Sequence, residues 1–209
     1  MIFFGHLGFG LQIAKPLFRH DELKKKRAVG FLLLGCVLPD LIDKPLYHGL
    51  SWITGKSGAE LGLISTTRTF GHTLVFLFLL FVLARWRKSP ALLMIAVGTA
   101  THLFVDHVGD TIGHAIFGSP FPTQYDEHGI SLNIVGLFWP FLGNRFPVFP
   151  FEHIMQHFDF FRRPHIAVGE VLGLIFLWKD RVVRQTVRQW IKERLWKRAY
   201  SPPRSKSSG

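Results

Sequence analysis

The sequence has little cysteine and few acidic side chains. Cys36 is the single cysteine among 209 residues, which excludes an internal disulfide framework and any multi-cysteine zinc site. Only 14 Asp and Glu stand against 25 Lys and Arg. The chain holds 11 histidines. A functional site would therefore be built most readily from histidine and carboxylate side chains.

The length favours one domain, and the composition favours a folded chain. Hydrophobic residues make up 48% of the sequence and charged residues 19%, which argues against disorder. The net charge is +11 although the mean hydropathy is positive, at +0.23. A basic soluble nucleic-acid binder is usually polar, whereas an apolar cationic chain more often lies in or on a membrane.

No uninterrupted apolar run clearly exceeds the length of a membrane span. The first run, residues 1–18, has no preceding positive charge and no small-residue cleavage pattern, so we do not expect a secretory signal peptide. Four further apolar stretches are shorter than, or at the edge of, the ~20 residues that a span needs. They cover residues 28–38, 70–84, 91–108 and 166–178. The stretches could be buried helices of a soluble domain or short spans.

The charges divide unevenly if these stretches run antiparallel. One end of the bundle then collects segments 15–27, 85–90 and 179–209, which hold 19 of the 25 basic residues and four of the 14 acidic ones. That end carries +15 and the remainder −4. Such asymmetry is typical of the positive-inside bias of membrane proteins, so we expect a membrane protein with its basic loops and C-terminus in the cytoplasm.

The pattern predicts an all-α fold, an antiparallel bundle of about five apolar helices. Apolar runs ended by Gly or Pro recur, and no segment alternates with period two. Residues 109–150 are rich in Gly and Pro and predict a long loop with one short helix near Leu132 to Leu137. Residues 179–200 predict a basic amphipathic helix, either on an anionic membrane surface or packed on the protein. Residues 201–209 predict a disordered tail. Helix boundaries are expected at Pro16, Pro39, Pro45, Pro90 and Pro164.

Four segments carry polar residues within this apolar chain. His102 and Asp106 have i, i+4 spacing and share one helical face, which Asp110 and His114 extend if the helix continues. Taken singly, a buried histidine or a helix-capping aspartate explains each residue. The antiparallel arrangement, however, places six of them at the end opposite the basic loops. They are His6, Asp40, Asp43, His72, His102 and Asp106.

Clustered carboxylates and imidazoles in apolar surroundings cost several kcal/mol each unless a cation compensates them. Nitrogen and oxygen ligands without thiolate suit zinc, manganese or iron(II). The sequence therefore predicts a divalent metal centre, with zinc first among the candidates. The number of ligands leaves room for a second ion bridged by Asp106.

These motifs together resemble a known family. Segment 35–43, segment 68–73, segment 101–106 and the later Phe138-Trp139-Pro140 resemble the membrane-bound metal-dependent hydrolases, a group that includes LexA-regulated inner-membrane proteins of bacteria. The resemblance covers roughly residues 1–142. It implies a membrane-associated hydrolase domain over residues 1–178, whose metal-activated water attacks an ester or phosphoester of a small molecule or lipid.

The order of ligands is also remotely similar to the zinc-dependent phospholipase C fold. That similarity implies Asp40, His72, His102 and Asp106 as one zinc's ligands, with His6 beside a neighbouring ion. Many members of the hydrolase family have Pro-Asp-x-Asp where this chain has Pro-Asp-Leu-Ile-Asp, so Asp43 either coordinates or supports. Thr67 stands where relatives often have histidine. Further ligands could come from Glu152, His153 and His157 or these could form a surface turn.

The predicted catalytic residues are Asp43 or Asp106 as the base and Arg68 as the group that holds an anion. For Arg68 the structural alternative is a pair with Asp40 or Asp43. An alternative function is a non-enzymatic integral-membrane protein with a structural metal ion. A soluble nucleic-acid binder is not expected, because the positive charge lies mainly in loops and a terminal helix.

Overall fold

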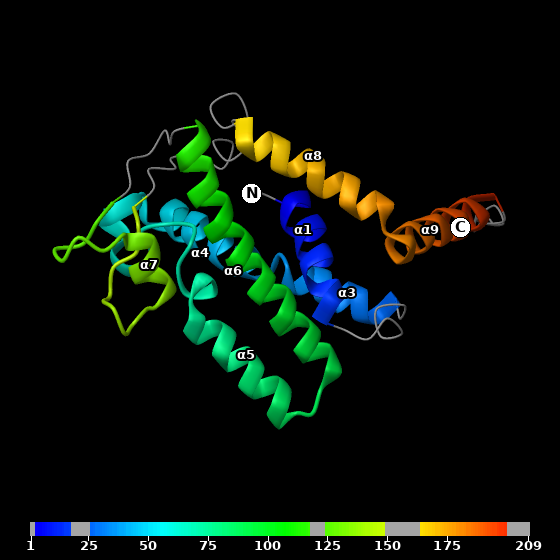
Figure 1. Cartoon of the computed structure of the whole chain (residues 1–209), viewed down its shortest axis with the longest axis horizontal. Helices are drawn as coiled ribbons and strands as arrows, with labels where there is room; N and C mark the ends of the chain where they lie inside the picture. The colour runs from blue at the N-terminus through cyan, green and yellow to red at the C-terminus, as the bar shows by residue number, and fades with distance from the viewer. Residues whose placement is uncertain (1–2, 18–25, 118–123, 149–163, 200–209) are drawn as a thin grey trace, which may run out of the picture.

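The computed structural model describes residues 3–17, 26–117, 124–148 and 164–199, without the side chains at 17, 112–117, 164–165 and 194–199. This part of the chain is helical (Figure 1), and its β structure is limited to one bridge between Tyr125 and Ser131. The all-α prediction is confirmed. The helices are α1 (Phe4–Ala14), α3 (Lys26–Gly35), α4 (Leu38–Thr54), α5 (Leu74–Trp86), α6 (Pro90–Phe117), α7 (Leu132–Leu137), α8 (Pro164–Lys179) and α9 (Arg181–Ala199), with 3-10 turns η1 (Lys15–Leu17), η2 (Gly58–Ile64) and η3 (Phe70–His72).

The five apolar stretches correspond to α1, α3, α5, α6 and α8, and the short helix in the loop is α7. The boundary expected at Pro45 is wrong, because Pro45 lies inside α4. Pro45 and Leu41 share the exposed side of that helix, where water can solvate the carbonyl that proline leaves without a donor. The loop expected from residue 109 is also shorter than predicted, because α6 continues through Gly109 to Phe117.

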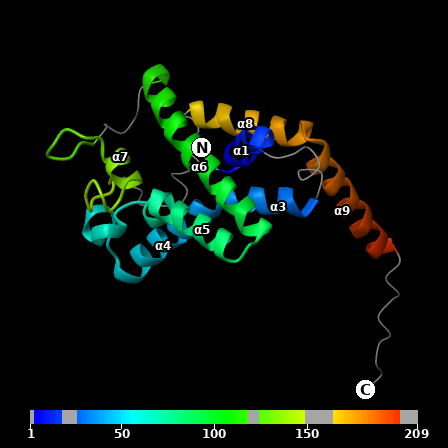
Figure 2. The same ribbon diagram turned by 60° about the horizontal axis from the view of Figure 1, so that its bottom comes forward.

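Helix α6 is the centre of the arrangement and contacts α1, α3 and α5, while α8 lies across α1 (Figures 1 and 2). One buried cluster joins α1, α3 and the end of α8. Its members are Leu7, Leu11, Ala14, Val29, Leu32, Cys36, Val37 and Leu177. Burying each Leu or Val side chain of this cluster stabilises the fold by about 1.5–3 kcal/mol, so the apolar faces of these helices favour this packing.

Glycines allow two helix pairs to approach closely. A Cβ atom on Gly35 would lie 2.1 Å from the Ile95 carbonyl oxygen, and one on Gly98 would lie 2.2 Å from the Leu32 carbonyl oxygen. The α1–α8 crossing is built in the same way, because a Cβ on Gly8 would lie 2.1 Å from the Gly173 carbonyl oxygen. Small residues at the contact are typical of helix packing in membranes.

Large apolar side chains point outward on α5 and α8. Phe78 is 64% exposed and Val171 is 58% exposed. Exposed apolar surface of this extent marks a protein or membrane contact. Among the described residues, the segment Pro90–Thr111 of α6 has the length and composition to cross a membrane, and α5 is a shorter apolar helix.

The basic end predicted from the sequence is partly assembled by direct contacts. Lys15 at the end of α1 pairs with Asp180 at the α8–α9 junction, with 2.8 Å between Nζ and Oδ2. Lys26 at the start of α3 donates a hydrogen bond to Gln189 of α9. The end of α1, the start of α3 and helix α9 therefore meet at one side of the molecule.

The close contact at Gly35 makes a prediction for stability. We expect Gly35→Ala to lower the free energy of unfolding by about 1–3 kcal/mol, because the added methyl group must push α3 away from α6. Gly30→Ala in the same helix is the matched control, because its Cβ would meet nothing within 4 Å. The control should gain about 0.5–1 kcal/mol from helix propensity. Thermal unfolding in detergent measures both changes, and equal effects of the two substitutions would contradict the packing argument.

Candidate metal centre

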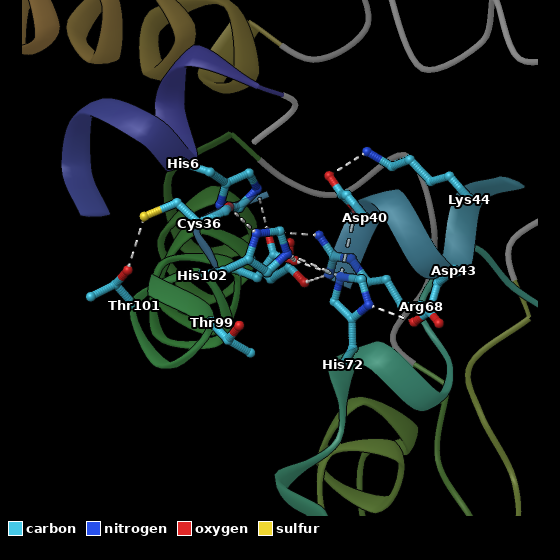
Figure 3. Close-up of polar contacts among 12 residues, drawn as sticks. His6, Cys36, Asp40, Asp43, Lys44, Arg68, His72, Thr99, Thr101 and His102 are labelled. Atoms are coloured by element: carbon cyan, nitrogen blue, oxygen red, sulfur yellow. Dashed lines mark hydrogen bonds and ion pairs between the residues drawn. The ribbon is translucent and has the colours of Figure 1, made fainter. Parts of the chain in front are cut away.

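Side chains from four elements converge beside the middle of α6 (Figure 3). His6 comes from α1, Asp40 from the first turn of α4, His72 from η3, and His102 and Asp106 from α6. His6 and His102 are almost completely buried, with 1% and 0% of their surface exposed. The structure therefore brings together all five residues that the sequence predicts as metal ligands.

The distances among the ligand atoms match the spacing of a metal coordination sphere. His72 Nε2 lies 3.1 Å from His102 Nε2 and 3.6 Å from Asp106 Oδ2, and His102 Nε2 lies 3.5 Å from the same oxygen. Asp40 Oδ1 lies 3.6 Å from His72 Nε2. Ligands at 2.0–2.1 Å from a tetrahedral ion are roughly 3.3 Å apart. His6 adds a fifth donor, with its Nε2 atom 3.2 Å from Asp106 Oδ1.

The outer nitrogens of two histidines fix which nitrogen faces the centre. His102 Nδ1 donates to the Cys36 carbonyl oxygen at 2.7 Å, and His72 Nδ1 donates to Asp43 Oδ2 at 2.7 Å. Both acceptors can only accept, so each Nδ1 carries a proton. In the neutral rings, both Nε2 atoms then present lone pairs to each other across 3.1 Å. Histidines that bind metal typically donate their other ring N–H to a carboxylate or a backbone carbonyl in this way.

The charge around the centre is also unbalanced. Four carboxylates lie in or beside it, while two cationic side chains contact them. Counted over these described side chains with neutral imidazoles, the carboxylates exceed the cations by two, and a divalent cation would offset that excess. The carboxylates are Asp40, Asp43, Asp106 and Asp110, and the cations are Lys44 and Arg68.

Asp43 lies behind His72 and is completely buried. Its carboxylate accepts hydrogen bonds from the Thr69 amide at 2.7 Å and the Gly71 amide at 3.0 Å, besides the bond from His72. Both oxygens are therefore engaged in orienting the loop that carries His72. Of the two alternatives open for Asp43, coordination or support, this geometry favours support.

Asp40 is placed at the positive end of a helix dipole. It follows Pro39 in the first turn of α4, where an anion is favoured. Burial alone would raise the pKa of Asp40, but the Lys44 ammonium group, 2.5 Å away, outweighs burial and holds that pKa below its usual value. The carboxylate is thus ionised and available as a ligand at neutral pH.

Arg68 pairs with carboxylates other than those considered from the sequence. Its Nη2 lies 3.2 Å from Asp106 Oδ1, and its Nη1 lies 2.5 Å from Asp110 Oδ2. Burial would lower the pKa of Arg68, but these two carboxylates outweigh it and raise the pKa above its usual value. Arg68 therefore stays charged and holds Asp106 in place, and each of its terminal nitrogens keeps a second N–H group.

Glu170 was not predicted to take part and holds the helix that carries His6. Its carboxylate, from α8, accepts hydrogen bonds from the amides of Phe3, Phe4 and Gly5 at 2.7–3.2 Å. These are amides at the start of α1, which have no partner within the helix. A signal was present in the sequence, because Glu170 is the one acidic residue in the apolar stretch 166–178.

A pocket opens beside the candidate centre, and residues of α7 are among those that line it. Its lining includes Arg68, His72 and Asp106 as well as the apolar Leu137 and Phe146. Gln124 holds the chain just after Phe146 by donating to the Val148 carbonyl and accepting from the Val148 amide. The part played by α7 had no signal in the sequence beyond its position in a long loop.

Some predicted residues do not join the site or lie outside the described part of the chain. Asp110 contacts Arg68 rather than the ligand atoms. The His114 side chain is outside the described residues, as are Glu152, His153 and His157. Helix α9 confirms a helix within 179–200, while the tail at 201–209 is also outside the description.

The family model described as YdjM inner membrane protein matches residues 1–178. This match covers α1 to α7, all of α8 except its last residue, and every residue of the candidate centre. No curated protein and no solved structure matches the chain.

The bonds to Glu170 make a prediction about the start of α1. We expect Glu170→Gln to lower the free energy of unfolding by about 1–3 kcal/mol, because an amide offers one acceptor oxygen and no charge to the three amides. Glu127→Gln is the control, since the Glu127 side chain is 79% exposed and should change stability by less than about 0.5 kcal/mol. Chemical unfolding in detergent compares them, and an unchanged Glu170→Gln protein would refute the anchoring role.

Proposed function

This chain belongs to the YdjM inner membrane protein family, and we propose that it is a membrane-bound hydrolase that uses a divalent metal ion, most suitably zinc. Its substrate would be an ester or phosphoester, of a lipid or of a small molecule. By the positive-inside bias, the basic loops and the C-terminus would face the cytoplasm.

One observation carries the metal proposal. The Nε2 atoms of His72 and His102 approach to 3.1 Å while both Nδ1 atoms already donate elsewhere. A proton shared between the two Nε2 atoms would relieve the repulsion between those atoms and nothing else. A cation would also attract the oxygens of Asp40 and Asp106, which lie 3.5–3.6 Å from the same nitrogens, and it would offset the excess of carboxylates over cationic side chains.

The pocket residues support hydrolysis as the chemistry. A bound divalent ion lowers the pKa of a water molecule from 15.7 toward about 7 and polarises the scissile group. Asp106 lines the pocket, so between the two candidate bases we assign proton acceptance to Asp106 and positioning of His72 to Asp43. Arg68 keeps Asp106 in place and can direct its remaining N–H groups toward an anionic substrate.

The walls of the pocket suit an amphiphilic substrate. The lining combines the charged Arg68 and Asp106 with the apolar Leu137 and Phe146. A lipid ester could place its head at the metal and its chain along these apolar groups. The remote similarity to zinc-dependent phospholipase C would fit such a substrate.

A second candidate is a non-enzymatic membrane protein with a structural metal ion. The burial of His6 and His102 favours it, because structural metal sites are closed whereas catalytic sites keep an open position. The pocket beside the ligands favours the hydrolase. Metal content and turnover, measured separately, distinguish the two.

Metal analysis of the purified full chain tests the centre itself. We expect at least one equivalent of a divalent metal in the wild-type protein and a loss of most of it in His102→Ala and in the more conservative His102→Gln. His128→Ala is the matched control, because the His128 side chain is 74% exposed. Circular dichroism of each variant reports whether it has folded. A wild-type protein without metal, or folded His102 variants that keep it, would overturn the proposal.

Hydrolysis of a generic phosphodiester and of a long-chain ester in detergent tests the enzyme. We expect turnover by the metal-loaded protein to fall roughly 10²–10⁴-fold in Asp106→Asn, while Glu127→Gln stays at the wild-type rate. Metal content is measured on the same samples. Metal retained without any His102-dependent turnover would favour the structural protein over the hydrolase.

A further inference from the structure

Within the described residues, α9 contacts the bundle at its first turn and at Gln189, which accepts a hydrogen bond from Lys26. Asp180 caps its start by accepting from the amides of Val182 and Val183, at 2.9 and 3.0 Å, and also pairs with Lys15. Val182 and Val183 pack against the buried cluster of α1 and α3. These contacts hold one side of α9 against the bundle and fix the direction in which its other side faces.

The remaining side of α9 combines charge with apolar surface. Val187 and Ile191 lie one turn apart and are 42% and 43% exposed. A row of basic residues at i, i+3 and i, i+4 spacing runs beside them along the helix. The row consists of Arg181, Arg184, Arg188 and Lys192. An apolar stripe beside a basic row is the pattern of a helix that lies in the membrane interface.

Exposed tryptophans mark the corresponding ends of two apolar helices. Trp86 ends α5 and is 76% exposed, with the Arg87 guanidinium 5.4 Å from its ring centre. Trp178, near the end of α8, is 62% exposed and is followed by Lys179. Tryptophan next to basic residues at helix ends is typical of the boundary between lipid and water.

Both helices run away from the candidate centre toward these tryptophans. His72 precedes the first residues of α5, and Glu170 in α8 contacts the start of α1 near His6. The C-terminal ends of α5 and α8 therefore lie away from the metal ligands, and α9 begins directly after α8. In Figure 1 α9 extends from the end of α8, away from α7.

We propose that the outer side of α9 lies on the headgroups of an anionic bilayer leaflet. Val187 and Ile191 enter the boundary with the acyl chains, and the four basic residues meet lipid phosphates. Charge complementarity selects anionic lipid as the occupant, because each Lys or Arg near such a surface strengthens binding about fivefold. The apolar stripe adds a contact that a charged polymer alone would leave unused. This inference is independent of the metal centre.

Site-directed spin labelling of the full chain tests this placement. Cys36 is 0% exposed, so a second cysteine can be labelled selectively. Ile191→Cys reports on the outer side, and Thr186→Cys, which lies roughly 140° away around the helix and is exposed in the structure, is the matched control. The labelled proteins are reconstituted in vesicles of phosphatidylcholine with or without phosphatidylglycerol.

In vesicles that contain phosphatidylglycerol, we expect oxygen to relax the Ile191 label while a water-soluble nickel chelate does not reach it. The Thr186 label should show the reverse. Replacing Arg184, Arg188 and Lys192 by Gln should weaken the docked state roughly a hundredfold and expose the Ile191 label to nickel, as should vesicles of phosphatidylcholine alone.

Three results would overturn the proposal. The Ile191 label could be as accessible to nickel as the Thr186 label in anionic vesicles. It could be shielded from both oxygen and nickel, which indicates a protein partner or a second copy of the chain. It could also become shielded on addition of an oligonucleotide and not with phosphatidylglycerol, which indicates a nucleic acid.

Discussion

The contact on which the rest of the structure depends is the 3.1 Å approach of His72 Nε2 to His102 Nε2. Two imidazole rings bring their Nε2 atoms this close only if hydrogen bonds fix the Nδ1 atoms. Here the Asp43 carboxylate accepts from His72 Nδ1, and the Cys36 carbonyl accepts from His102 Nδ1. Those two groups lie at the end of α3 and in the first turns of α4. The α3–α4 junction must therefore sit against α6, which requires the glycine contacts at Gly35 and Gly98.

The same constraint explains why a carboxylate in α8 matters to a site it does not touch. His6 stacks on His102, with ring centres 3.9 Å apart, so α1 must be fixed along its own axis as well as sideways. The Gly8–Gly173 crossing sets the sideways approach, and the bonds from Glu170 to the first amides of α1 set the axial position. Helix packing and ligand geometry are in this way parts of one arrangement.

Sequence reasoning identified most of the candidate site because unusual residues stand out in an apolar chain. His102 and Asp106 share a helix face by their spacing, and an antiparallel arrangement was enough to place His6 and His72 nearby. It could not assign the role of Asp43 or the partners of Arg68, since these depend on loop conformation and side-chain direction. It also ended a helix at Pro45, because the exposure of that side of α4 depends on tertiary packing.

The division of charge along the chain follows from the same requirements. Neutral imidazoles and ionised carboxylates can share a centre only where few cations compete for the carboxylates, and within the described centre Lys44 and Arg68 each bind particular oxygens. Among the described residues, several other basic side chains lie at the ends of α1, α5 and α8 and in α9, such as Lys15, Arg85 and Lys179. The length of these helices sets the distance between the basic end and the candidate centre. The net charge of +11 is a sum over both ends and describes neither of them.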